Sequence, residues 1–159
     1  MIKIIDPGLY SSIQDNGRHN YQKYGVSISG CMDLKASYFA KKTNLVCLSD
    51  DSGLEIDLLN GSPGIYSARW AGANNNFNQA IERVFLEMNK IKKNWQNEAN
   101  AKFICCLSLF WPDGKSYSSK GLIKGKISSQ KRGNRGFGYD PIFIPDGYHK
   151  TFGEMKPEL

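Results

Sequence analysis

The chain has 159 residues, a formal net charge of +6, four cysteines and two histidines. This length allows one domain with a real hydrophobic core, and the 40% hydrophobic content is that of an ordinary globular protein. Its apolar runs fall well short of the roughly 18 residues of a membrane-spanning helix. The opening MIKIIDPG is interrupted too early for a signal peptide. We therefore expect a cytoplasmic protein with no membrane partner.

The cysteines and the basic charge narrow the function classes further. No two cysteines form a Cys-x-x-Cys pair, which argues against a structural zinc site. Cys105 and Cys106 lie in an apolar run and are expected in the core. The positive charge suits an anionic partner, either nucleic acid or a polyphosphate. Basic runs such as KIKKNW and QKRGNRG lack the interleaved aromatic residues of a single-strand binding platform, so we expect no nucleic-acid partner.

The first half of the chain predicts short elements separated by turns. In order, these are a strand at residues 2–5, a turn-rich segment at 8–30, a helix at 33–42, and strands at 45–49 and 54–59. Asp33 is a candidate N-cap of the first helix. The alternating LEIDLL is either a second short strand or the continuation of LVCLS.

The second half contains the clearest helix. An apolar stripe marks residues 77–91, with a cap among Asn74 to Asn76; its members are Phe77, Ile81, Val84, Phe85, Met88 and Ile91. A strand at 101–111, a Pro-Asp-Gly turn and a strand at 116–128 predict a hairpin. A glycine-rich loop then leads to a last strand at 141–145. This order predicts an α/β or α+β fold with a mixed central sheet and flanking helices.

The stretch SDDSG places two carboxylates side by side at the end of a strand. If the strand continues, Asp50 and Asp51 point to opposite faces, so one can meet a ligand. Magnesium often takes one or two protein carboxylates plus substrate phosphates. Ser52 adds a hydroxyl, and turn amides can face an anion. The residues predict either a metal-and-phosphate site or an acidic cap that bonds local amides.

The loop GNRGFGYDP carries three glycines within six residues, which lets backbone amides approach a ligand. Phe137 and Tyr139 offer flat faces for a purine, and Asp140 could accept from a ring N–H. Arg132 and Arg135 could pair with phosphate. The other interpretation is a hairpin loop whose aromatic side chains cap the core, and the Walker A spacing is absent.

Other polar residues give weaker signals. Ser67 and Arg69, in GSPGIYSARWAG, are candidates for a nearby site, although Arg69 equally suits a surface ion pair. His149 suits a loop better than a general base. The cysteines have no histidine partner nearby in sequence, so a thiol nucleophile is not favoured.

Together, SDDSGLEIDLLNGSPGIYSARWAG, CLSLFWPDG and GNRGFGYDPIFIPDGYHKTFGEM resemble the inosine/xanthosine triphosphate pyrophosphatases. The resemblance implies hydrolysis of dITP, ITP or XTP to the monophosphate and pyrophosphate, with Mg²⁺ as cofactor. It assigns Asp51 to the metal and the attacking water, and Ser52 to the substrate. It assigns Phe137, Gly138, Tyr139 and Asp140 to the base. A purine nucleoside triphosphate is then the expected partner, and the resemblance also suggests a homodimer.

The resemblance covers residues 44–159, which predicts a partial pyrophosphatase domain over that range. Residues 1–43 instead resemble the start of a 5-oxoprolinase component related to the carboxyltransferase-like domain of urea amidolyase, through IQDNGR and GVSISGCMD. The pyrophosphatase family's Thr/Ser-x-Asn-x-x-Lys loop, its upstream metal-binding Glu and its Ser-His-Arg end have no counterpart here. We therefore expect an inosine triphosphatase-like fold truncated at both ends, with impaired turnover. The alternative is a non-catalytic nucleotide-binding remnant or interaction protein.

Overall fold

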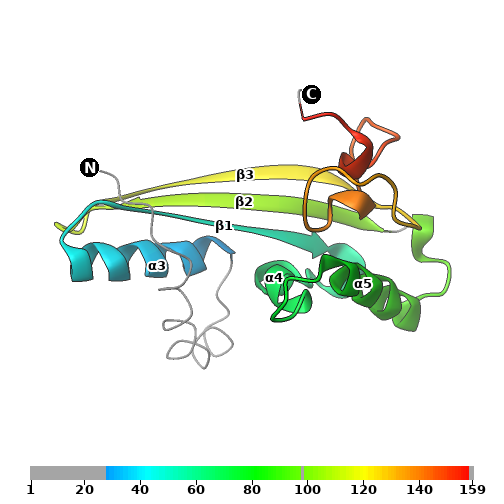
Figure 1. The fold of residues 1–159 in the computed structure, drawn as a ribbon, viewed down its shortest axis with the longest axis horizontal. Coiled ribbons are helices and arrows are strands. Elements are labelled where there is room, and N and C mark those ends of the chain that lie inside the picture. The colour runs from blue at the N-terminus through cyan, green and yellow to red at the C-terminus, as the bar shows by residue number, and fades with distance from the viewer. Residues whose placement is uncertain (1–27, 98, 158–159) are drawn as a thin grey trace. The chain divides into compact units, whose positions relative to one another are not determined.

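The computed structural model describes residues 28–97 and 99–157. Helix α3, Ile28–Thr43, precedes strand β1, Cys47–Ile56. The short helix α4, Ser67–Trp70, and the longer α5, Phe77–Ile91, follow. Strands β2, Asn100–Phe110, β3, Ser116–Ile127, and β4, Phe143–Pro145, complete a four-stranded sheet in the order β1-β2-β3-β4 (Figure 1). The predicted α/β class, with a central sheet and flanking helices, is confirmed.

The described residues also contain five single-turn 3-10 helices. They are Asp57–Leu59, Gly64–Tyr66, Trp95–Asn97, Asp140–Ile142 and Phe152–Glu154. The predicted strand at 2–5 and the turn-rich segment before residue 28 lie outside the described residues. None of the helices in the described part is long and apolar enough to cross a bilayer.

The chain divides into two compact units. One comprises Met1–Asp51 and Cys105–Gly121, and the other Ser52–Ile104 and Leu122–Leu159, so the three long strands contribute residues to both. In the first unit, Phe39 and Ala40 of α3 and Cys47 of β1 form a small buried cluster. Apolar contact between helix and strand therefore anchors α3 to this part of the sheet.

The second unit contains the larger core. Ile81, Val84 and Met88 of α5 are buried together with Leu54, Ile56, Ile142 and Phe143. The predicted apolar stripe of the helix is thus the packed face except at Ile91, which is exposed, and Asn76 caps the helix by accepting from the amides of Asn78 and Gln79. The antiparallel β3–β4 pairing joins Ile127 to Phe143 in register and brings the glycine-rich loop back to the sheet.

Three local predictions need correction. LVCLS and LEIDLL form one continuous strand, which was one of the two alternatives, but this strand begins at Cys47 and ends at Ile56, so Leu45, Val46 and residues 57–59 lie outside it. Helix α3 begins at Ile28, so Asp33 lies inside the helix and is not its N-cap. Cys106 is buried as expected, but Cys105 is exposed, because adjacent residues of a strand face opposite sides.

Candidate functional site

Asp51 lies in β1 where the strand continues through both acidic residues. Its carboxylate Oδ2 is 3.4 Å from the ammonium of Lys35, on helix α3 of the same unit. The Lys35 side chain is 10% exposed and that of Asp51 is 24% exposed, whereas Asp50 is exposed. The strand alternation predicted for these two residues therefore directs Asp51, and not Asp50, towards a partly buried cation.

A polar cluster surrounds this pair in the first unit. The Asp33 carboxylate accepts hydrogen bonds from the hydroxyls of Ser108, at 2.6 Å, and Ser118, at 2.8 Å. These bonds tie α3 to β2 and β3. Burial raises the pKa of the neighbouring Cys106 thiol, and the charges of Asp51 and Asp33 act in the same direction against the opposing Lys120. A thiol held neutral in this way is a poor nucleophile, in line with the sequence interpretation.

The FGYD segment forms a tight turn in the second unit. The Asp140 carboxylate accepts from the Phe137 amide at 2.8 Å, and the Asp140 amide donates to the Phe137 carbonyl at 3.1 Å. Burial raises the pKa of Asp140, while the bond from the Phe137 amide opposes this shift. The turn leaves the Phe137 ring 79% exposed. Phe137 thus presents an open aromatic face on a fixed backbone.

Tyr139 points the other way. Its side chain is 2% exposed, its ring packs edge-on against Phe77, and its hydroxyl donates to the Ser67 carbonyl at 2.9 Å. Burial raises the pKa of Tyr139, so the phenol stays protonated and keeps this bond. Its ring is therefore unavailable for stacking on a base, and the residue anchors the turn.

The other candidates occupy different positions. Ser52 follows Asp51 in β1 and is exposed. Gly138 has a φ of +64°, a conformation that favours glycine. The Ser67 hydroxyl accepts from the Leu54 amide and donates to the Gly64 carbonyl, which gives it a structural role. The Arg69 guanidinium lies over the Tyr66 ring.

The glycine-rich loop is fastened to the segment that follows β4. The Arg132 amide donates to the Pro141 carbonyl, and the Thr151 hydroxyl donates to the Arg132 carbonyl at 2.7 Å. Arg135 donates through its amide to the Gly153 carbonyl and through its side chain to the Glu154 carbonyl. The His149 carbonyl accepts a hydrogen bond from the Arg132 side chain. These hydrogen bonds therefore hold the loop against the segment that follows it in the chain.

Lys35 is the clearest residue that sequence reasoning missed. It lies 16 positions before Asp51, inside a helix whose apolar pattern is weak. The only available signal was a lysine in a predicted helix next to an acidic strand end, and many surface lysines share that description.

The donor set limits how a metal could be held. Within the described residues no group of three or more His, Cys, Asp or Glu side chains converges. Asp51 supplies a single partly exposed carboxylate, with the Ser52 hydroxyl next in the chain. This set fits a hard cation that takes one protein carboxylate and completes its coordination with phosphate oxygens and water.

Fold and geometry define an α/β protein with a cation-paired aspartate on one strand and an exposed aromatic residue on a glycine-rich turn. The sequence model of the Ham1 family matches residues 6–159, and the chain belongs to that family. The match begins at residue 6, so it includes most of the segment that resembles the 5-oxoprolinase component. That resemblance and the domain boundary after residue 43 stay predictions.

Individual proteins give the same result. A dITP/XTP pyrophosphatase of Zymomonas mobilis is 43% identical over 134 residues, which cover 84% of this chain and 63% of that protein. One of Rhodospirillum centenum is 46% identical, over 78% of this chain and 60% of that protein. The Staphylococcus aureus Ham1 structure aligns with a TM-score of 0.77 and 32% identity, covering 99% of this chain and 86% of that one. The chain thus spans about three fifths of the length of these two curated relatives.

Proposed function

We propose that this chain supplies residues for the Mg²⁺-dependent hydrolysis of non-standard purine nucleoside triphosphates, dITP, ITP or XTP, to the monophosphate and pyrophosphate. Family membership supports the reaction class, because the relatives above bear the name dITP/XTP pyrophosphatase. The observation that carries the proposal is the ion pair between Lys35 and Asp51, the second aspartate of the DDSG motif.

The reaction needs a base and a positively charged environment. A water oxygen forms a bond to the α-phosphorus, the bond from that phosphorus to the bridging oxygen breaks, and pyrophosphate leaves with the electron pair. Asp51 would take the proton of the attacking water, and Lys35 would keep the carboxylate in one position. Mg²⁺, when bound at Asp51, would neutralise phosphate charge.

The FGYD turn would recognise the base. The exposed Phe137 ring offers a stacking face, while Asp140 and Tyr139 hold the turn from which it projects. Gly138 and Ser52 stay proposed substrate contacts. A fixed turn reduces the entropy lost when a ligand binds.

The test is pyrophosphate release from dITP, with and without Mg²⁺, by the purified chain and two variants. Asp51→Asn removes the proposed base. Asp50→Asn is the matched control, because it makes the same change at the exposed neighbouring position. We expect Mg²⁺-dependent release that Asp51→Asn lowers by about 100-fold or more and Asp50→Asn leaves nearly intact.

The opposite results are equally informative. Equal loss in both variants would show that the motif matters only as an acidic cap. Nucleotide binding without release, from a folded sample, would favour a non-catalytic nucleotide-binding protein. A homodimer and a cytoplasmic location stay predictions, which light scattering and cell fractionation check.

A further inference from the structure

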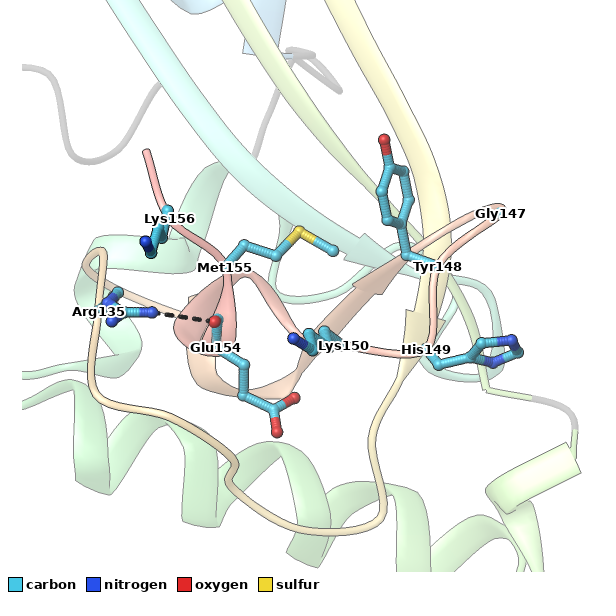
Figure 2. A pocket seen from close by; sticks show the side chains of 8 residues that line it. All are labelled: Arg135, Gly147, Tyr148, His149, Lys150, Glu154, Met155 and Lys156. Atoms are coloured by element: carbon cyan, nitrogen blue, oxygen red, sulfur yellow. Dashed lines mark hydrogen bonds between the residues drawn. The ribbon is translucent and has the colours of Figure 1, made fainter. Parts of the chain in front are cut away.

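A cavity of about 440 Å³ lies in the second unit, between the turn after β4 and the segment that follows Phe152–Glu154. Arg135, Tyr148, Lys150 and Lys156 line it together with Glu154 and Met155 (Figure 2). Its size is within the range of small-molecule sites. None of these residues takes part in the proposed hydrolysis.

The charges around this cavity favour an anion. Among the lining residues, the three cationic side chains of Arg135, Lys150 and Lys156 outnumber the one carboxylate, that of Glu154. Glu154 already accepts from the Thr151 amide at 2.9 Å and lies 3.4 Å from Arg132, and the pKa of Glu154 is lowered, chiefly by the bond from the Thr151 amide. Within the part of the chain that the structure describes, neither Lys150 nor Lys156 forms an ion pair. The cavity thus carries an excess of positive charge, although the charge of Lys150 also acts on Glu154 and contributes to its lowered pKa.

The opposite side of the cavity is apolar. Tyr148 is a large side chain left 54% exposed. Figure 2 shows the Met155 side chain extending towards the Tyr148 ring, with Arg135 and Lys156 on the other side. A ligand that satisfies both sides has an anionic group at one end and a flat apolar group at the other.

We propose that this cavity is a second nucleotide site, separate from the Phe137 turn. The phosphate lies against Lys150, Lys156 and the Arg135 guanidinium, and the base stacks on the Tyr148 ring. Arg135 already donates to the Glu154 carbonyl, so it is held in place before a ligand arrives. Binding here needs no hydrolysis, so the inference does not rest on the proposed function.

Calorimetric titration of the full chain with inosine monophosphate, without Mg²⁺, tests this. The parent chain is titrated first, and all other titrations use a Phe137→Ala background, which removes stacking at the other turn. Lys150→Gln/Lys156→Gln removes two charges from the cavity, and Lys93→Gln/Lys126→Gln removes two from exposed positions elsewhere. We expect the first pair to weaken binding about tenfold and the second to change it less than about twofold. If both double variants weaken binding equally, the proposal is overturned, because the net charge of the protein alone would then explain the effect.

Two further titrations distinguish a nucleotide from a bare anion. Tyr148→Ala should weaken inosine monophosphate about fivefold and leave inorganic pyrophosphate unaffected. Free inosine should bind far more weakly than the monophosphate. Loss of all binding through Phe137→Ala alone would place the ligand at the FGYD turn and overturn a second site. Pyrophosphate binding as tight as that of the nucleotide, with no effect of Tyr148→Ala, would also overturn it.

Discussion

The hydroxyl of Tyr139 donates a hydrogen bond to the carbonyl of Ser67, 72 residues earlier in the chain. The bond joins the FGYD turn to helix α4 inside the second unit. Because both partners are buried, water cannot replace either of them at low cost. The exposed position of the Phe137 ring therefore depends on Tyr139, whose own ring is buried.

Removing this hydroxyl should destabilise the protein without altering the packing of the ring. Tyr139→Phe keeps the edge-on contact with Phe77 but leaves the Ser67 carbonyl without its partner. We expect the free energy of unfolding, measured with urea, to fall by about 1–3 kcal/mol. Tyr148→Phe is the control, because that exposed hydroxyl makes no hydrogen bond within the described residues, and its effect should stay within about 0.5 kcal/mol.

Local patterns were sufficient to predict α5 and the β2–β3 hairpin. The apolar stripe on residues 77–91 matches the bounds of α5, and the Asn76 cap is confirmed. The Pro-Asp-Gly turn does lie between β2 and β3, where the Trp111 amide donates to the Lys115 carbonyl. These features depend on residues close in sequence, so periodicity and turn chemistry determine them.

The same local patterns could not predict contacts between residues that are distant in sequence. Tyr139 was predicted either to face a base or to cap the core, and its ring lies against Phe77 while its hydroxyl donates to Ser67, both distant in sequence. Asp33 was predicted to cap a helix, and it bonds two serines more than 70 residues away. Side-chain direction at such positions is set by tertiary packing, which no local pattern encodes.

The backbone at Gly133 should tolerate no side chain. A Cβ there would overlap the carbonyl of Gly153, and the φ of +76° disfavours any other residue. We expect Gly133→Ala to lower the free energy of unfolding by more than about 3 kcal/mol. Gly147→Ala isolates the backbone contribution, because φ is +84° but nothing lies within 4 Å, so about 1 kcal/mol is expected. Similar losses in both variants would show that the overlap is relieved by movement.

Asp33 should contribute to stability through its two serine partners. Asp33→Ala removes the acceptor for Ser108, which is fully buried, and for Ser118. A loss of about 1–3 kcal/mol in urea unfolding is expected. Asp33→Asn retains one acceptor oxygen and should lose less. Asp50→Ala, at an exposed strand position, is the control, and a loss there as large as that of Asp33→Ala would refute the role of these bonds.

The pH dependence of stability should reveal the burial of Asp140. Burial raises the pKa of Asp140 above its ordinary value of 3.8, so the folded state binds the proton more tightly than the unfolded state. Stability from this group is present at low pH and lost as pH rises from about 3.8 through the folded-state pKa. Asp140→Asn does not titrate, so its stability relative to the parent should increase over that window and then level off.

An aspartate with the opposite shift serves as the comparison for this experiment. The pKa of Asp113 is lowered, chiefly by the bond from the Lys115 amide. Relative to the parent, Asp113→Asn should therefore lose stability as pH rises towards 3.8, the ordinary value. Urea unfolding from pH 3 to pH 7 measures both variants. The same sign in both would contradict the burial argument for Asp140.

Lys35 should act through Asp51 and not on its own. Lys35→Met removes the ammonium that lies 3.4 Å from Asp51 while keeping an apolar side chain of similar length. We expect the rate of pyrophosphate release from dITP to fall about 10- to 100-fold, mainly in kcat, because the carboxylate loses its fixed position. Lys35→Arg should restore part of the rate. In an Asp51→Asn background the Lys35→Met change should have little further effect, since the two residues form one unit. Independent, multiplicative losses in the double variant would instead assign Lys35 a separate contact with the substrate.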